Sequence, residues 1–257
     1  MRKLFLFLVT LIGSTCYAAD VNVTPETFGT AYGAAQDGDV LVLSEGAYST
    51  QITPQSGKWI TVKAADGVIP VLTCNVRCSD VNVTDCGLTF EGCDINHNTG
   101  DNYFINFDNI GHVKGLVFRN CTIENVGRCL IRTNNEGYYI DSIVFSNCIM
   151  KNNGANAWNF MYPKHAVGKL SVKNSTFYNY TSGENFFCAN AINTNNVMTF
   201  DCENNTFYNW GKDSGRSILN ISTKYSTSSN FIIRNNIFAE ADGRPAQNIV
   251  VATGGNL

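Results

Sequence analysis

A few polar and charged residues recur at positions suited to recognising an acidic sugar. Arg132 lies two residues before Asn134, and Asn106 and Asp108 have the same spacing further upstream. A guanidinium neutralises a carboxylate, and amide groups hydrogen-bond hydroxyls. Proton removal beside a uronate carboxylate needs such a cation and a base within hydrogen-bond reach. Arg132 is therefore a candidate for an acidic-sugar contact or a catalytic base, with a solvated or salt-bridged arginine as the alternative.

Two further segments carry residue types suited to catalysis or binding. The segment "NFMYPKHAVGK" (159–169) places Tyr162, Lys164 and His165 together, and a lysine beside a histidine would form an acid–base pair. The segment "NWGKDSGRS" (209–217) combines an aromatic ring with charges in a glycine-containing loop, which suits a clamp on an acidic glycan. Its binding candidates are Trp210, Lys212 and Arg216. The alternatives are a solvated loop histidine and a simple insertion.

These segments lie between copies of a repeated phrase. "VFRNCTIENV" (117–126) is followed by "VFSNCIMKNN", "SVKNSTFYNY", "DCENNTFYNW" and "IIRNNIFAEA", at steps of 27, 27, 30 and 31 residues. Apolar residues lie two and four positions before the shared asparagine and three positions after it, so the inward-facing parity changes there. This predicts a strand on each side and a corner at the asparagine, which tolerates left-handed backbone. The predicted corner residues are Asn120, Asn147, Asn174, Asn204 and Asn235.

A third strand fits between successive phrases. The segments are 103–108, 129–134, 157–162, 186–190, 217–222 and 248–253. Three short strands and three corners in each repeat predict an all-β, right-handed parallel β-helix, in which stacked asparagines form an amide ladder. We expect a signal peptide over 1–18, an N-terminal cap over 19–36 that contains a short helix with Thr24 as its N-cap and Pro25 as its first residue, and the β-helix over 37–257. The segment "ATGGNL" at the end has no cap pattern, which suggests a further C-terminal module.

Strand alternation predicts which side chains of the third strand set face outward. Ile105, Phe107, Ile131, Thr133, Phe187 and Ala189 should point inward. The outward stripe should then hold Asn106, Asp108, Arg132, Asn134, Phe160, Tyr162, Cys188, Asn190, Asn220 and Ser222. Amides, an acid, a cation and aromatic rings in one stripe suit a polysaccharide. The alternative is the ordinary polar face of a solenoid.

The segment 37–72 carries a family resemblance. "GDVLVLSEGAYST" followed by "ITVKAADGVIPVL" resembles the first coil of pectate-lyase-like β-helix proteins, including the chondroitinase-B and alginate-lyase branch. The repeated phrases are also similar to those of uncharacterised secreted β-helix proteins of polysaccharide-degrading bacteria. The resemblance implies β-elimination of a uronate-containing glycan, with Arg132 or Lys164 as base, calcium as the cofactor and Asp108 as a metal ligand.

The sequence departs from that family in its catalytic motifs. The Asn-Thr-Asp, Asp-Asp and Gly-His-Gly motifs of the related hydrolases are absent, and carboxylates are sparse. A non-catalytic glycan-binding protein, or an adhesin-like scaffold with a protein partner, therefore stays open beside the lyase.

The N-terminus and composition indicate the compartment. Arg2 and Lys3 precede an apolar run at 4–13 and small residues up to Ala18, which is typical of a secretory signal peptide. Lipidation of Cys16, with a cell-surface anchor, is the alternative to a freely secreted periplasmic or extracellular chain. No later run is long enough to span a membrane. Charged residues make up 15% and the net charge is −3, which disfavours a nucleic-acid partner.

Nine cysteines follow the predicted signal peptide. Cys93, Cys121 and Cys148 have the repeat spacing, so stacked coils would hold them about 4.8 Å apart, beyond the usual Cβ separation of a disulfide of about 3.8 Å. We expect these three to be buried thiols. The cluster of Cys74, Cys78 and Cys86 is the better disulfide candidate, and it has no zinc-site spacing around it.

Overall fold

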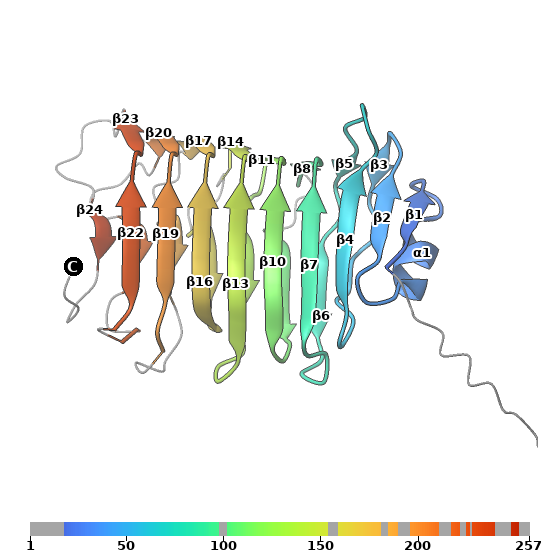
Figure 1. The fold of residues 1–257 in the computed structure, drawn as a ribbon, viewed down its shortest axis with the longest axis horizontal. Coiled ribbons are helices and arrows are strands. Elements are labelled where there is room, and N and C mark those ends of the chain that lie inside the picture. Colours follow the sequence, from blue (N-terminus) through green and yellow to red (C-terminus); the bar gives the residue numbers. More distant parts are fainter. Residues whose placement is uncertain are drawn as a thin grey trace, which may run out of the picture.

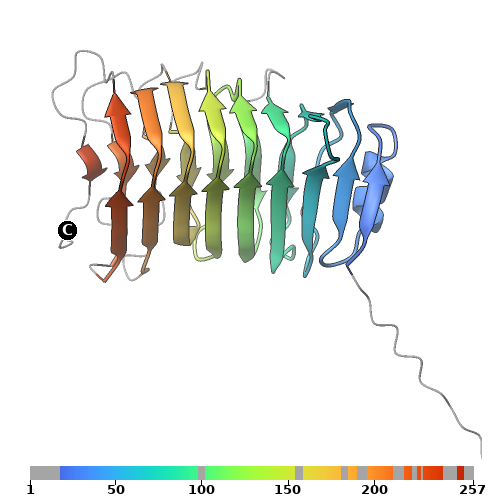
Figure 2. The same cartoon turned by 45° about the horizontal axis from the view of Figure 1, so that its top comes forward.

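The protein is a solenoid of parallel strands wound into three sheets (Figure 1). This computed structural model describes residues 18–97, 102–153, 159–180, 185–189, 196–210, 217–221, 225–226, 228–239 and 248–251. Strands of the same sheet pair in parallel from one coil to the next, and the turned view shows them stacked along one axis (Figure 2). The predicted all-β parallel β-helix is confirmed.

Each sheet collects one strand from successive coils. Sheet A contains β1 (Asp20–Val23), β2 (Val40–Leu43), β4 (Trp59–Ala64), β7 (Cys86–Glu91), β10 (Val113–Arg119), β13 (Tyr139–Ser146), β16 (Ala166–Lys173), β19 (Thr199–Glu203) and β22 (Asn230–Arg234). Sheet B contains β3 (Ala47–Tyr48), β5 (Val71–Leu72), β8 (Asp94–Asn96), β11 (Thr122–Glu124), β14 (Ile149–Lys151), β17 (Thr176–Tyr180), β20 (Thr206–Trp210) and β23 (Ile237–Ala239). Sheet C contains β6 (Val76–Ser79), β9 (Tyr103–Asn109), β12 (Cys129–Thr133), β15 (Met161–Pro163), β18 (Phe187–Cys188), β21 (Ser217–Asn220) and β24 (Asn248–Val251).

One short helix, α1 (Phe28–Ala34), lies at the N-terminal end of the solenoid (Figure 1). Its N-cap is Thr27 rather than the expected Thr24, because residues 24–27 form a turn in which the Thr27 amide donates to the Thr24 carbonyl at 3.1 Å. The helix buries Phe28 and Tyr32, and the Phe28 ring meets the edge of Tyr48 at 5.4 Å between centroids. The apolar end of the core is therefore covered here.

The predicted asparagine corners are present between sheets A and B. Their φ angles are 52° for Asn120, 54° for Asn147, 52° for Asn174, 57° for Asn204 and 56° for Asn235. The Asn147 side chain donates to Asn120, and that of Asn204 donates to Asn174, each at 3.3 Å. The structure adds a second corner ladder at the C-terminal ends of the sheet B strands, which the sequence alignment missed. Its positive-φ residues are Asn125, Asn152, Asn179 and Asn209.

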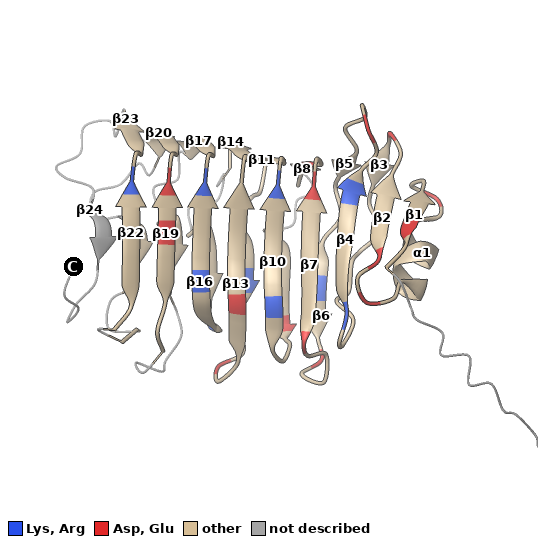
Figure 3. Cartoon of the chain, viewed as in Figure 1, with Lys and Arg blue, Asp and Glu red and all other residues tan. Residues whose placement is uncertain are grey.

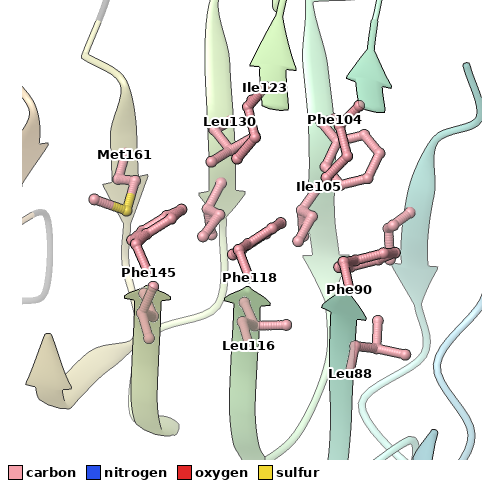
Figure 4. Packing of buried hydrophobic residues seen from close by; sticks show 14 of the residues in the cluster. Leu88, Phe90, Phe104, Ile105, Leu116, Phe118, Ile123, Leu130, Phe145 and Met161 are labelled. Atoms are coloured by element: carbon pink, nitrogen blue, oxygen red, sulfur yellow. The ribbon is translucent and has the colours of Figure 1, made fainter. Parts of the chain in front are cut away.

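The core consists of columns of apolar side chains, each resting on its counterpart in the next coil (Figure 4). Phe90, Phe118 and Phe145 stack at centroid distances of 5.4 and 4.9 Å. Phe177 and Phe207 stack in a second column at 4.4 Å. Burying each phenylalanine contributes about 2–3 kcal/mol. These columns therefore dominate stability and fix the strand register.

All nine cysteines in the described part of the chain are free thiols. Cys93, Cys121 and Cys148 are buried, as predicted. The disulfide suggested for Cys74 and its neighbours is not formed. Cys74 lies in the link between β5 and β6, Cys78 lies in β6 of sheet C and Cys86 lies in β7 of sheet A, so the three buried thiols enter the core from different parts of the coil. Burial raises the pKa of the Cys74 thiol to about 12.

Candidate functional site

The outer face of sheet C brings most of the predicted binding residues into one column. Strand pairing aligns Arg77 with Asn106, Asn106 with Arg132, and Arg132 with Tyr162. Cys188 and Asn220 are paired in the next two coils. Their strand neighbours, such as Ile105, Ile131 and Met161, are buried, so this column faces outward. We call it the sheet C column, consisting of Arg77, Asn106, Arg132, Tyr162, Cys188 and Asn220.

Arg132 is the most closely positioned cation of this column. Its guanidinium lies 4.9 Å from the centroid of the Tyr103 ring, and Nη1 donates to Asn106 Oδ1 at 3.5 Å. Nη1 is also 4.0 Å from Asp108 Oδ1, a loose ion pair. The Arg132 side chain is 32% exposed. Its orientation is therefore fixed on one side, while part of the guanidinium faces solvent and is available to an anion.

Asp108 is surrounded by hydrogen-bond donors. Asn134 Nδ2 donates to Asp108 Oδ1 at 2.7 Å, and Asn106 Nδ2 lies 3.3 and 3.4 Å from its two oxygens. Calcium requires six to eight oxygen ligands, and these amide and guanidinium groups direct nitrogen toward the carboxylate instead. No cluster of three or more His, Cys, Asp or Glu side chains suited to a metal occurs among the described residues. The expected calcium site at Asp108 does not fit this arrangement.

Tyr162 and Lys164 follow Arg132 in the next coil. Burial is the main cause that raises the pKa of Tyr162, and the Cys188 thiol raises it further while Arg132 lowers it. The phenol therefore keeps its proton at neutral pH and can donate a hydrogen bond. Lys164 Nζ lies 3.4 Å from Glu136 Oε1, and both side chains are partly exposed. Lys164 and Glu136 thus form a partly exposed ion pair beside the sheet C column.

The structure removes His165 from the candidate catalytic group. The Lys164 and His165 amides both donate to Thr133 Oγ1, at 3.0 and 3.1 Å, and the chain turns inward there. The His165 side chain is fully buried, with Nε2 3.2 Å from the Gly111 carbonyl. Burial lowers the pKa of its imidazole. His165 is a neutral core residue that a substrate on sheet C cannot reach.

Trp210 is also wrongly placed by the sequence prediction. It is 4% exposed and stacks on Tyr180 with 4.4 Å between centroids. As the last residue of β20, it pairs with Tyr180 and continues the inward aromatic column of sheet B. Phe160, expected to face outward, is fully buried and packs against the same Trp210 ring at 5.4 Å. Both aromatics stabilise the core and contribute no sugar-stacking surface.

Two predicted outward positions and two predicted loop residues lie beyond what the structure describes. Asn190, Lys212, Arg216 and Ser222 fall outside the described residues. Asn106 faces outward by register, yet it is only 4% exposed because its amide is engaged by Arg132 and Asp108. Its amide oxygen helps to orient the Arg132 guanidinium.

The sequence analysis missed three contributors to this face. Tyr103 supports the Arg132 guanidinium, and its hydroxyl accepts a hydrogen bond from Arg128 Nη1 at 3.2 Å. Arg77 joins the column through β6, whose coil precedes the first clear asparagine repeat. The usable signal was Arg128, directly before the predicted third-set strand 129–134.

Comparisons with known proteins place the fold. No curated protein matches the chain. The structure of the PL6 family alginate lyase AlyGC is similar, with a TM-score of 0.51 and 15% identity over 92% of this chain and 38% of the lyase. An arginine-to-alanine variant of the same lyase gives a TM-score of 0.53 and 15% identity over 91% of this chain and 37% of the variant.

This chain spans less than two fifths of the length of those lyases. At such low identity the likeness shows the parallel β-helix fold alone. It agrees with the predicted resemblance to polysaccharide-lyase β-helices. A family model described as a domain of unknown function, DUF4957, matches residues 46–180. Since this match covers more than half of its length, the chain belongs to the DUF4957 family.

Proposed function

We propose that this protein binds an acidic polysaccharide along the outer face of sheet C, with Arg132 contacting a sugar carboxylate. The observation that carries this proposal is the Arg132 guanidinium, held over Tyr103 and only loosely paired with Asp108 at 4.0 Å. A positioned arginine forms two parallel hydrogen bonds to a carboxylate, and less entropy is lost when the cation is already oriented.

The neighbouring side chains suit an extended ligand. Three coil steps separate Arg77 from Tyr162, so the column between them is about 14 Å long. Asn134 and the Tyr162 phenol provide hydrogen-bonding groups for hydroxyls beside the cation. The predicted leader at residues 1–18 supports a proposal that binding takes place outside the cytoplasm. Among the described residues no helix is long and apolar enough to cross a membrane.

A second candidate function is β-elimination at the same face, supported by the shared fold with alginate lyases. Arg132 would neutralise the carboxylate, since an arginine stays protonated in proteins. The base is harder to assign: Lys164 is paired with Glu136, Tyr162 keeps its proton, and His165 is buried. The geometry therefore favours binding over catalysis.

The test compares Arg132→Ala and Arg132→Lys with Lys169→Ala, which removes one exposed cation from the outer face of sheet A. Affinity for pectate, alginate and chondroitin oligosaccharides would be measured by calorimetry at low salt. Loss of a charge-assisted hydrogen bond should weaken binding roughly tenfold in Arg132→Ala. The control should match wild type. Equal affinities in wild type and Arg132→Ala for every bound glycan would refute the proposal.

The same glycans, incubated with and without calcium, distinguish binding from elimination. A lyase forms unsaturated uronates, which absorb in the ultraviolet, and Arg132→Ala would abolish that rise. Binding without any rise in absorbance would remove the second candidate and keep the first.

A further inference from the structure

A column of charged residues follows the outer face of sheet A, one coil step apart. Strand pairing aligns its members without a gap. We call it the charge column, consisting of Lys63, Glu91, Arg119, Ser146, Lys173, Glu203 and Arg234. Figure 3 shows it near the arrowheads of the sheet A strands, where blue and red alternate from β4 to β22 and only β13 is tan. The signs thus read plus, minus, plus, neutral, plus, minus, plus.

Because positive and negative residues alternate, the charged side chains at both ends of this column form ion pairs. Lys63 Nζ lies 3.9 Å from Glu91 Oε1. At the other end, Lys173 Nζ lies 2.8 Å from Glu203 Oε1 and 2.7 Å from Asp201 Oδ2, and Arg234 Nε bonds the second oxygen of Glu203. Opposite charges on directly paired strand positions stabilise a sheet, and like charges destabilise it. A carboxylate between two cations is therefore the rule in this column.

The rule fails at Ser146, between Arg119 and Lys173. Arg119 is exposed, and within the described part of the chain its guanidinium makes no ion pair or side-chain hydrogen bond. Across the same described residues, the Ser146 hydroxyl has no hydrogen-bond partner, although the Ser146 carbonyl accepts from the Asn120 amide at 3.0 Å. The Arg119 guanidinium and the Ser146 hydroxyl therefore lie on paired strand positions, and Ser146 occupies the position where the alternation predicts a carboxylate.

We propose that an anionic group of a ligand, a carboxylate or a sulfate, binds over Ser146 and completes the alternation. Coils lie about 4.8 Å apart, so Arg119 and Lys173 flank this position at about one coil step on either side. Arg119 makes the direct contact because Lys173 is already shared between two carboxylates. The Ser146 hydroxyl donates the second hydrogen bond.

This anion site is separate from the sheet C face and does not rest on the proposed function. Sheet A and sheet C are different walls of the solenoid (Figure 1). The site recognises one charged group and so accepts either an inorganic sulfate or the carboxylate of a sugar acid. Exposed ion pairs are screened by salt, which predicts binding that weakens as ionic strength rises.

The decisive variant is Ser146→Glu, which supplies the missing carboxylate from the chain itself. Ser146→Gln is its matched control, with the same size and no charge. Both are compared with wild type by NMR of the ¹⁵N-labelled chain, titrated with sodium sulfate or sodium galacturonate while sodium chloride keeps the ionic strength constant. The reporters are the backbone amides of Arg119 and Ser146, or of the residue that replaces Ser146, and the Arg119 Nε–H signal.

Wild type should give saturable shifts at these signals that chloride does not produce. Ser146→Glu should weaken the apparent affinity about fivefold, the upper end of the effect of one exposed ion pair, and Ser146→Gln should stay within about twofold of wild type. Saturation by galacturonate but not sulfate would assign the site to a sugar acid, and saturation by both to any such anion. Absence of saturable shifts in wild type, or equal affinity in Ser146→Glu, would overturn the proposal. Shifts confined to Arg132 would also overturn it, while leaving the sheet C proposal intact.

Discussion

Replacing Asn205 with alanine should be among the most damaging single changes to the corner between sheets A and B. Asn205 is 2% exposed and follows the positive-φ corner residue Asn204. Its Oδ1 accepts the backbone N–H of Ser175 at 2.9 Å, and its Nδ2 donates to the Val172 carbonyl at 2.8 Å. The side chain thus links two successive coils from inside the solenoid.

The magnitude follows from the groups left behind. Asn205→Ala leaves the buried Ser175 N–H without this acceptor, which costs about 1–3 kcal/mol, and it loses a second hydrogen bond of about 1 kcal/mol. We therefore expect the free energy of unfolding to fall by about 2–4 kcal/mol. Urea denaturation followed by circular dichroism would measure it as a lower midpoint at unchanged slope.

Asn205→Ser is the matched comparison, because the protein already uses serine at this column position. Ser175 Oγ accepts the Cys148 N–H at 3.1 Å, in the way that Asn205 accepts the Ser175 N–H. Asn205→Ser should recover at least half of the loss. The reasoning is refuted if alanine costs less than about 1 kcal/mol or if serine is no better than alanine.

Two further predictions concern the outer face of sheet A. Gly115→Ala should destabilise the fold, because an added Cβ would lie 2.5 Å from the Trp59 ring, and a double variant with Trp59→Ala should lose less than the sum in thermal denaturation. His112 Nε2 and Nδ1 each lie 2.7 Å from a carboxylate, of Asp141 and Asp85, and these hydrogen bonds, Asp141 first, raise its pKa. A histidine whose pKa is raised in the folded state contributes its full stabilisation below the unfolded-state pKa of about 6.5. That stabilisation is lost as pH rises through the folded-state pKa. The stability difference between wild type and His112→Gln should accordingly shrink above that pH, and a constant difference from pH 5 to 9 would contradict this.

Repetition made the fold predictable from the sequence. The asparagine at each corner and the phenylalanines two and three positions away recur because each must rest on its own counterpart, as Phe118 does on Phe90 and Phe145. The second asparagine ladder was missed although Asn125, Asn152, Asn179 and Asn209 each lie five residues after a corner asparagine, because the prediction followed apolar parity around the first corner only. Their positive φ angles identify these residues as corners.

The candidate site was predictable only where strand alternation held. Arg132, Asn134 and Asp108 were placed together correctly because β9 and β12 are regular. Trp210 and Phe160 failed because each sits at a strand end, where a large ring gains more from joining the aromatic core than from facing water. His165 failed for a related reason: Thr133 draws the chain inward just after β15. The inward–outward alternation of side chains within a strand does not predict the direction of side chains at strand ends or in the turns that follow.

The outward-facing columns of this solenoid are of two kinds, which differ in whether they indicate a ligand. In a column of identical residues, such as the corner asparagines, the side chains hydrogen-bond one another, so the column gives no indication of a ligand. A column that changes residue type from coil to coil is satisfied by complementary partners, as Lys173 is by Glu203. Two positions in these columns have incomplete charge pairing. Arg132 lies 4.0 Å from the Asp108 carboxylate, and Arg119 is paired on one side with Ser146 instead of with a carboxylate. These are the two positions at which we propose that an external anionic group binds. Arg132→Ala and Ser146→Glu test these proposals on two separate walls of the same molecule.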